Sequence, residues 1–150
     1  MNKEEKLVLY FDADDDGTGK LFAEASSSGF SGVGEAWFDR IQLLEFANAL
    51  ATYPLPSDNL PKIAGGFWRN NLAGELDQEH LAISVYPIDG KGGLGVQVKL
   101  STELWSEMRP EQQHIVKLEI TTSYNALEKF SKEFVALING RVERAVLQNL

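Results

Sequence analysis

Two segments of this chain pass in the same way from a strand pattern into a helix pattern. Residues 34–38 lead into a helix pattern over 43–50, and residues 119–124 lead into one over 127–134. In both helix patterns a Leu is followed three residues later by a Phe, which places the two side chains on one face of a helix. Because two further strand-like segments precede each passage, the sequence predicts a repeated unit of three strands and a helix.

The two predicted units cover about residues 7–52 and 81–138 of a chain of 150 residues. A chain of this length forms one domain with a single sizeable core, so we expect residues 1–150 to fold as one unit. The predicted fold class is α+β, with antiparallel sheet and two helices arranged as two similar βββα halves.

In the first half, strand patterns at 7–11 and 20–25 flank a segment rich in Asp and Gly, which predicts a β-hairpin. A Ser- and Gly-rich turn follows, and a third strand is expected over 33–38. Asp39 has the side chain of a helix N-cap, and the helix that it starts cannot continue through the prolines from Pro54 onward.

In the second half, apolar and polar residues alternate over 81–86, 94–100 and 116–121, which is the period of half-buried strands. The helix that follows has either Ser123 or Asn125 as its N-cap. Its apolar stripe consists of Leu127, Phe130, Phe134, Leu137 and Ile138. A short final strand is expected within residues 141–147.

Residues 53–80 have no clear pattern and contain the run Gly65, Gly66, Phe67, Trp68. A connection of this length inside a compact domain usually has structure of its own or a functional role. Trp68, beside Phe67 and Arg69, is the residue in this stretch best suited to anchor a partner, because Trp and Arg are enriched at the centres of protein interfaces. We therefore take Phe67, Trp68 and Arg69 as a candidate partner-binding site.

Charge and composition narrow the function classes. Asp and Glu total 22 against 14 Lys and Arg, and the net charge of −8 repels nucleic-acid backbones. We therefore expect no nucleic-acid binding. The sequence has no basic amphipathic helix, membrane span or signal-peptide pattern, so we expect no membrane contact and a cytoplasmic location. The absence of Cys excludes disulfides and thiolate chemistry.

The Asp-rich hairpin loop matches the start of a calcium-binding loop, in which alternate carboxylates surround the cation. Asp12, Asp14 and Asp16 occupy the first three alternate positions, and Gly17 follows. The bidentate carboxylate expected at the twelfth position is missing, because Ala23 stands there. The pattern is also typical of a solvated acidic turn, and calcium is the one cofactor that the sequence suggests.

No catalytic constellation emerges from the sequence. The two histidines, His80 and His114, fall on opposite faces of the predicted sheet, with His80 on the polar face beside Ala82 and Ser84, so a shared metal or proton relay is not expected. The string G-x-G-x-x-G at 90–95 leads into a strand and not into a helix, so it does not predict a dinucleotide site.

Three functional hypotheses remain. The first is a non-enzymatic protein-binding module that binds a cationic partner, of the type of bacterial immunity proteins that cover cationic toxins or of a regulatory protein. That comparison rests on size and acidity and on no shared motif. The second is a module that binds calcium or a small ligand through Asp12–Asp16. The third is an enzyme that uses carboxylates, although the sequence places no carboxylate pair.

Overall fold

The computed structural model describes residues 4–68 and 75–149. The elements of these residues, in chain order, are β1 (Glu5–Ala13), β2 (Thr18–Ser27), β3 (Phe30–Asp39), α1 (Arg40–Ala49), β4 (Lys62–Trp68), β5 (Leu76–Pro87), β6 (Gly93–Ser101), the short 3₁₀ helix η1 (Pro110–Gln112), β7 (Ile115–Ser123), α2 (Tyr124–Ile138) and β8 (Ala145–Asn149). The predicted α+β class is confirmed.

The strands form two antiparallel sheets of four strands each, in the described part of the chain. The first sheet has the order β3-β2-β1-β8 and the second has the order β4-β5-β6-β7. Each half therefore contributes a three-stranded meander followed by a helix: β1, β2, β3 and α1 in one half, and β5, β6, β7 and α2 in the other. The strands β4 and β8 lie outside this repeat and each extends a sheet by one strand.

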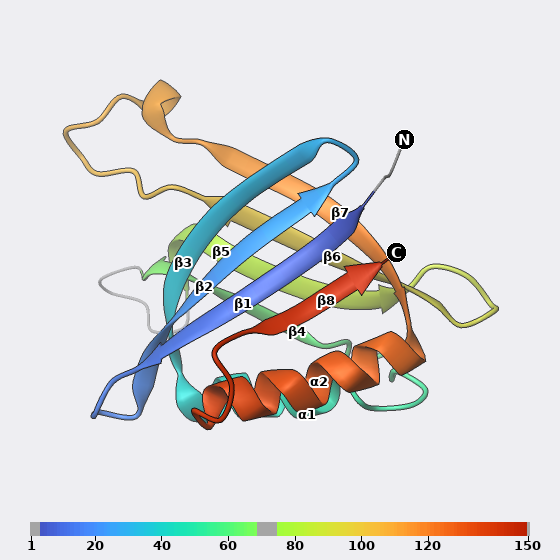
Figure 1. Ribbon diagram of the computed structural model, residues 1–150. Helices are drawn as coiled ribbons and strands as arrows, with labels where there is room; N and C mark the ends of the chain where they lie inside the picture. The colour runs from blue at the N-terminus through green and yellow to red at the C-terminus, as the bar shows by residue number, and fades with distance from the viewer. Residues whose placement is uncertain (1–3, 69–74, 150) are drawn as a thin grey trace.

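Both helices lie beside the two sheets and pack on each other (Figure 1). Asp39 caps α1 by accepting from the backbone N–H groups of Ile41 and Gln42, as its side chain predicts. Of the two predicted caps for α2, Ser123 is the one that accepts, from the N–H of Ala126. Leu43 and Phe46 of α1, and the predicted stripe of α2, are buried in one core with the inner faces of the sheets.

Two contacts hold the helices together. The rings of Phe46 and Phe134 meet edge to face, with centroids 6.1 Å apart. The hydroxyl of Ser131 on α2 donates to the backbone oxygen of Ala47 on α1 at 2.6 Å, so this buried polar side chain is satisfied across the interface. The equivalent helices of the two halves thus form a single packed layer.

The two sheets approach each other most closely where β3 crosses β5 and β6. A Cβ atom at Gly34 would lie 3.0 Å from the backbone oxygen of His80, and one at Gly32 would lie 2.5 Å from Cγ1 of Val116. Glycine therefore permits backbone-to-sheet contact at this crossing, which any larger side chain would push apart. At this crossing β3 is an edge strand of the first sheet.

Two sequence-based expectations need correction, and one stretch that the sequence left open is now assigned. Residues 62–68, which had no legible pattern, form β4, and β5 starts at Leu76, before the alternation becomes regular. The final strand is β8, over Ala145–Asn149 and not within 141–147 as expected. His80 is buried, 2% exposed, although its parity with Ala82 and Ser84 predicted the polar face. The register between β4 and β5 shifts at Gly65/Gly66, and this bulge turns His80 inward together with Leu81.

Candidate functional site

The outer face of the first sheet carries large apolar side chains at positions where alternation predicts polar ones. Leu21 and Ala23 of β2 point to the core, whereas their neighbours Phe22 and Glu24 point outward. The outward apolar side chains on this face are Tyr10 on β1, Phe22 on β2, and Val33 and Trp37 on β3. Val33 is 67% exposed and Trp37 is 51% exposed. We call this surface, together with the carboxylates described next, the aromatic–acidic face.

Carboxylates alternate with these apolar side chains. Glu24 is paired in register with Val33, and Glu35 is paired with Phe22. One lysine, Lys20, approaches Glu35 with its Nζ atom 3.5 Å from Oε1. The same Nζ lies 5.7 Å from the centroid of the Phe22 ring and 5.4 Å from that of Trp37. The face therefore already holds an ammonium group between a carboxylate and two aromatic rings.

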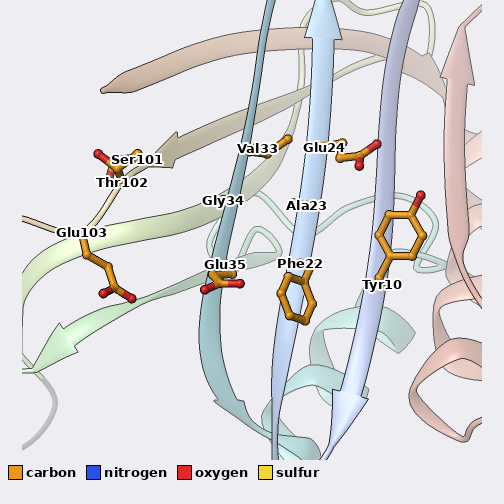
Figure 2. Close-up of a pocket in the computed structure, with 10 residues that line it drawn as sticks. All are labelled: Tyr10, Phe22, Ala23, Glu24, Val33, Gly34, Glu35, Ser101, Thr102 and Glu103. Carbon is orange, nitrogen blue, oxygen red and sulfur yellow. The ribbon is translucent and has the colours of Figure 1, made fainter. Parts of the chain in front are cut away.

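A cavity of about 730 Å³ adjoins this face, where β3 runs beside the residues that follow β6. Figure 2 shows its lining residues: Tyr10, Phe22, Ala23, Glu24, Val33, Gly34 and Glu35 from the first sheet, and Ser101, Thr102 and Glu103 from the end of β6. Three carboxylates, those of Glu24, Glu35 and Glu103, thus surround an apolar floor, and among the residues that the structure describes no basic side chain lines the cavity. Its chemistry suits a cationic group with an apolar stem.

A second cluster adjoins the segment 101–105, which the cavity shares. Phe67 lies between His80, at 4.5 Å between ring centroids, and Trp105, at 4.7 Å. The side-chain amide of Gln78 fixes the segment, because it donates to the backbone oxygen of Leu104 at 2.7 Å and accepts from the N–H of the same residue at 3.1 Å. Glu103 and Trp105 are therefore held on either side of an anchored residue.

Burial lowers the pKa of His80, and the nearby charge of Glu103 opposes this shift. The ring nitrogen Nε2 lies 2.9 Å from Oε1 of Gln78. Because the two bonds to Leu104 assign Oε1 as the acceptor end of that amide, we assign the proton of the neutral imidazole to Nε2. His80 is thus a neutral core side chain that supports the 101–105 segment.

Two of the three predicted partner residues, Phe67 and Trp68, are described by the structure, and they differ in exposure. The ring of Phe67 packs inside the molecule, as described above, whereas Trp68 at the end of β4 is 49% exposed. Trp105, 51% exposed, contacts Phe67 and extends the aromatic surface towards Glu103. Arg69 lies outside the described residues. The sequence did not link Trp105 to this cluster, because Trp105 stands 37 positions after Trp68 along the chain.

The predicted calcium ligands lie in the β1–β2 hairpin. Asp12 belongs to β1 and pairs with Lys20, while Asp14 and Asp16 are exposed in the turn. Asp16 accepts from both the hydroxyl, at 2.6 Å, and the N–H of Thr18, and these bonds lower the pKa of its carboxyl group. Within residues 4–68 and 75–149, no three His, Asp or Glu side chains are grouped so that they could hold a metal ion.

The aromatic–acidic face itself escaped the sequence analysis, although a signal for it was present. Phe22 stands between Lys20 and Glu24 in parity, and Trp37 stands between Glu35 and Asp39, so both aromatic residues occupy the polar side of their strands. Glu103 had no such signal, because it follows β6 and reaches the cavity only through the crossing of the two sheets.

Comparison of the chain with protein-family models, with curated proteins and with solved structures found no match. In the part of the chain that the structure describes, no helix has the length and apolar character needed to cross a membrane.

Proposed function

We propose that this protein is a non-enzymatic binding module for a cationic protein, of the immunity or regulatory type, and that the aromatic–acidic face is its contact surface. The observation that carries the proposal is the combination of the exposed Trp37 and the half-buried rings of Tyr10 and Phe22 on one sheet face with the carboxylates of Glu24, Glu35 and Glu103 around the adjoining cavity. The face would cover basic side chains of its partner.

The physics of such a contact divides into two parts. Carboxylates and the net charge of −8 would steer a cationic partner and raise its association rate. Aromatic side chains such as Trp37 would exclude water at the centre of the contact and slow dissociation. The position of Lys20, over Phe22 and Trp37 and beside Glu35, supports this assignment, because it shows that the face accommodates a cation.

Three related predictions from the sequence concern nucleic-acid partners, cellular location and the extent of the partner surface. Acidity argues against nucleic-acid partners, and a cytoplasmic location stays a prediction, as does the contribution of Trp68 and Arg69 to a partner surface. Trp68 would extend the contact beyond the cavity, because Phe67 and Trp105 link β4 to the segment 101–105.

The test compares two variants that lose the same charge. Glu24→Gln/Glu35→Gln/Glu103→Gln removes the carboxylates of the cavity, and Glu45→Gln/Glu128→Gln/Glu143→Gln removes three exposed carboxylates elsewhere. Affinity capture from cells that express the protein naturally should recover a basic protein with the wild type and the control variant, and not with the cavity variant.

Binding kinetics with the recovered protein then separate the two parts. The cavity variant should associate roughly tenfold or more slowly at low salt, and the difference should shrink as the ionic strength rises. Trp37→Ala should mainly accelerate dissociation. Recovery of the same proteins by all three forms, or a partner that is insensitive to both salt and Trp37→Ala, would contradict the proposed function.

A further inference from the structure

Each sheet ends in two edge strands, whose unpaired backbone groups can bind another strand unless the fold protects them. The edge strands of the first sheet are β3 and β8, and those of the second are β4 and β7. The four edges differ in how the fold protects them, and this difference indicates a specific mode of binding.

Three of the four edges are obstructed. On β8, the N–H of Val146 donates to Oε1 of Glu133 on α2 at 2.6 Å, so the helix occupies the edge. On β7, the N–H of Thr121 donates to Oε1 of Glu5 on β1 at 3.2 Å. The pairing of β4 with β5 shifts register at two places, and such bulges twist an edge away from regular pairing.

The edge of β3 has no such protection. Ser28 and Gly29, both with positive φ, form the two-residue turn that joins β2 to β3. Ser27 and Phe30 flank this turn and are the first pair of the ladder. At the other end, the N–H of Arg40 donates to the oxygen of Gly17, which makes Thr18 and Asp39 a pair without mutual hydrogen bonds.

Both ends of the β2–β3 ladder indicate the same hydrogen-bonding pattern. The even-numbered residues of β3 bond to β2, so the N–H and C=O groups of the odd-numbered residues point away from it. These outward groups belong to Ser31, Val33, Glu35 and Trp37. In the described residues β2 is the only hydrogen-bonded neighbour of β3. The strand spans ten residues, with neither Pro nor Lys among them to discourage pairing.

The open edge lies against the cavity. Val33, Gly34 and Glu35 form one side of it, and Ser101, Thr102 and Glu103 lie opposite (Figure 2). A strand that paired with β3 here would have alternate side chains on the outer face, next to Glu24 and Glu35, and the intervening ones towards the segment 101–103. A second copy of this chain is a poor occupant, because its own β3 would bring acidic side chains and no basic ones to this acidic edge.

We propose that the free edge of β3 binds an extended segment of the cationic partner as a fifth strand of the first sheet, with Lys or Arg side chains at the alternate positions that lie on the outer face, next to Glu24 and Glu35. The inference rests on the proposed function and specifies its recognition mode. Backbone hydrogen bonds supply part of the affinity, and the carboxylates select basic side chains.

The probes are two synthetic octapeptides with blocked ends, one alternating Arg and Val and the other alternating Glu and Val. Each is titrated into the isotope-labelled full chain and followed by amide NMR. The Arg peptide should shift the amides of Val33, Glu35 and Trp37 and of residues 101–103, and should slow the hydrogen exchange of the outward amides. The Glu peptide should leave them unchanged.

The decisive variant is Val33→Pro, with Val33→Ala as its control. Proline removes an N–H that points away from β2 and therefore leaves the internal ladder intact. Val33→Pro should weaken the Arg peptide by about tenfold, the effect of one or two lost hydrogen bonds, whereas Val33→Ala should change it less than threefold. Thermal melts establish that both variants fold.

A second measurement does not depend on how Val33→Pro folds. The Arg peptide is N-methylated either at all its Arg residues or at all its Val residues, so that each form lacks the N–H groups of one edge. One methylated form should bind as the parent peptide does, and the other should lose binding.

Four results would overturn strand addition. They are equal binding of both methylated peptides, equal effects of Val33→Pro and Val33→Ala, shifts centred away from β3, and no binding of the Arg peptide at millimolar concentration. A dimer that Val33→Pro dissociates would assign the edge to a second copy and would overturn it as well. If the cavity variant Glu24→Gln/Glu35→Gln/Glu103→Gln still loses the captured partner, the proposed function stands without strand addition.

Discussion

The outer faces of the two sheets differ in kind, although both belong to antiparallel sheets over one core. The first sheet presents Tyr10, Phe22, Val33 and Trp37 among carboxylates. The second presents mostly short or charged side chains at the same parity, among them Ala82, Ser84, Gln97, Lys99 and Lys117, with Tyr86 and Ile115 as large exceptions. The second face is mainly polar, whereas the first groups several large apolar side chains that the fold of the single chain does not fully bury.

This difference shows what alternation alone can and cannot explain. A polar outer face follows from the period of a half-buried strand. Aromatic residues on that face need a further reason, because apolar area that stays exposed to water adds little to the stability of the isolated chain. Comparing substitutions on the two faces, and on the inner face between them, tests whether that reason is binding.

The largest difference in stability should be the one between substitutions on the inner and the outer side of β2. Leu21 is fully buried, so Leu21→Ala should lower the free energy of unfolding by about 2–5 kcal/mol. Phe22→Ala, one residue on, should cost at most about 1 kcal/mol, through loss of its cross-strand contact with Tyr10. Urea denaturation measures both. Equal losses would mean that the outer aromatics are structural, and the comparison between the faces would fail.

The next effect concerns the contact that joins the two sheets. The carboxylate of Glu5 accepts from the hydroxyl of Ser27 at 3.0 Å and from the hydroxyl of Thr121 at 2.6 Å. Glu5→Ala should therefore cost roughly 1.5–3 kcal/mol, as expected for hydrogen bonds to a charged group. Glu45→Ala on the exposed side of α1 is the control. If the faces act separately, Glu5→Ala should leave partner affinity unchanged at temperatures where the variant is folded.

A pH titration should show a smaller effect, which comes from His80, the side chain that supports the 101–105 segment. Burial lowers the pKa of His80 in the folded chain below its ordinary value of 6.5. As the pH falls below about 6.5, the unfolded chain takes up this proton first, so the free energy of unfolding decreases. Denaturation at pH 7.5 and at pH 5.5 should show this decrease, and His80→Gln should reduce it.

The smallest effects should be those of exposed side chains on stability. Lys99→Ala on the second sheet should change the free energy of unfolding by no more than about 0.5 kcal/mol. Trp37→Ala on the first sheet should cost no more than about 1 kcal/mol, which covers the loss of its contact with Lys20. Calorimetric melts would reveal a larger cost for Trp37→Ala, which would assign that side chain to the fold.

The parts of the fold that the sequence predicted are those with regular side-chain periodicity. The alternation over 81–86 and 94–100 located β5 and β6, and the apolar stripe around Phe130 located α2. In β4 the run Ala64, Gly65, Gly66 has no side chains large enough to show a period, so that strand was not predicted. Its glycines instead accommodate neighbours: a Cβ at Gly65 would lie 2.7 Å from the ring of Phe38.

The candidate site was less accessible to sequence reasoning, because its residues are brought together by tertiary structure. Glu35 and Glu103 are 68 positions apart and line one cavity only because β3 crosses the second sheet. The buried position of His80 depends on a bulge in the neighbouring pairing, which no local pattern reveals. Phe67 and Trp68 did mark a region near the cavity, but the aromatic neighbour Trp105 could be assigned to it only in three dimensions.

The place of β8 has a consequence for how the chain is made. β8 pairs with β1, so that Leu7 lies opposite Leu147 in the finished sheet. During synthesis, the first three strands leave the ribosome long before residues 145–149, and until those arrive β1 has no neighbour on its second side. Such distant pairing slows folding and exposes an apolar strand in the meantime. The first sheet therefore stays incomplete, with one side of β1 open, until residues 145–149 have been synthesised and have paired with it.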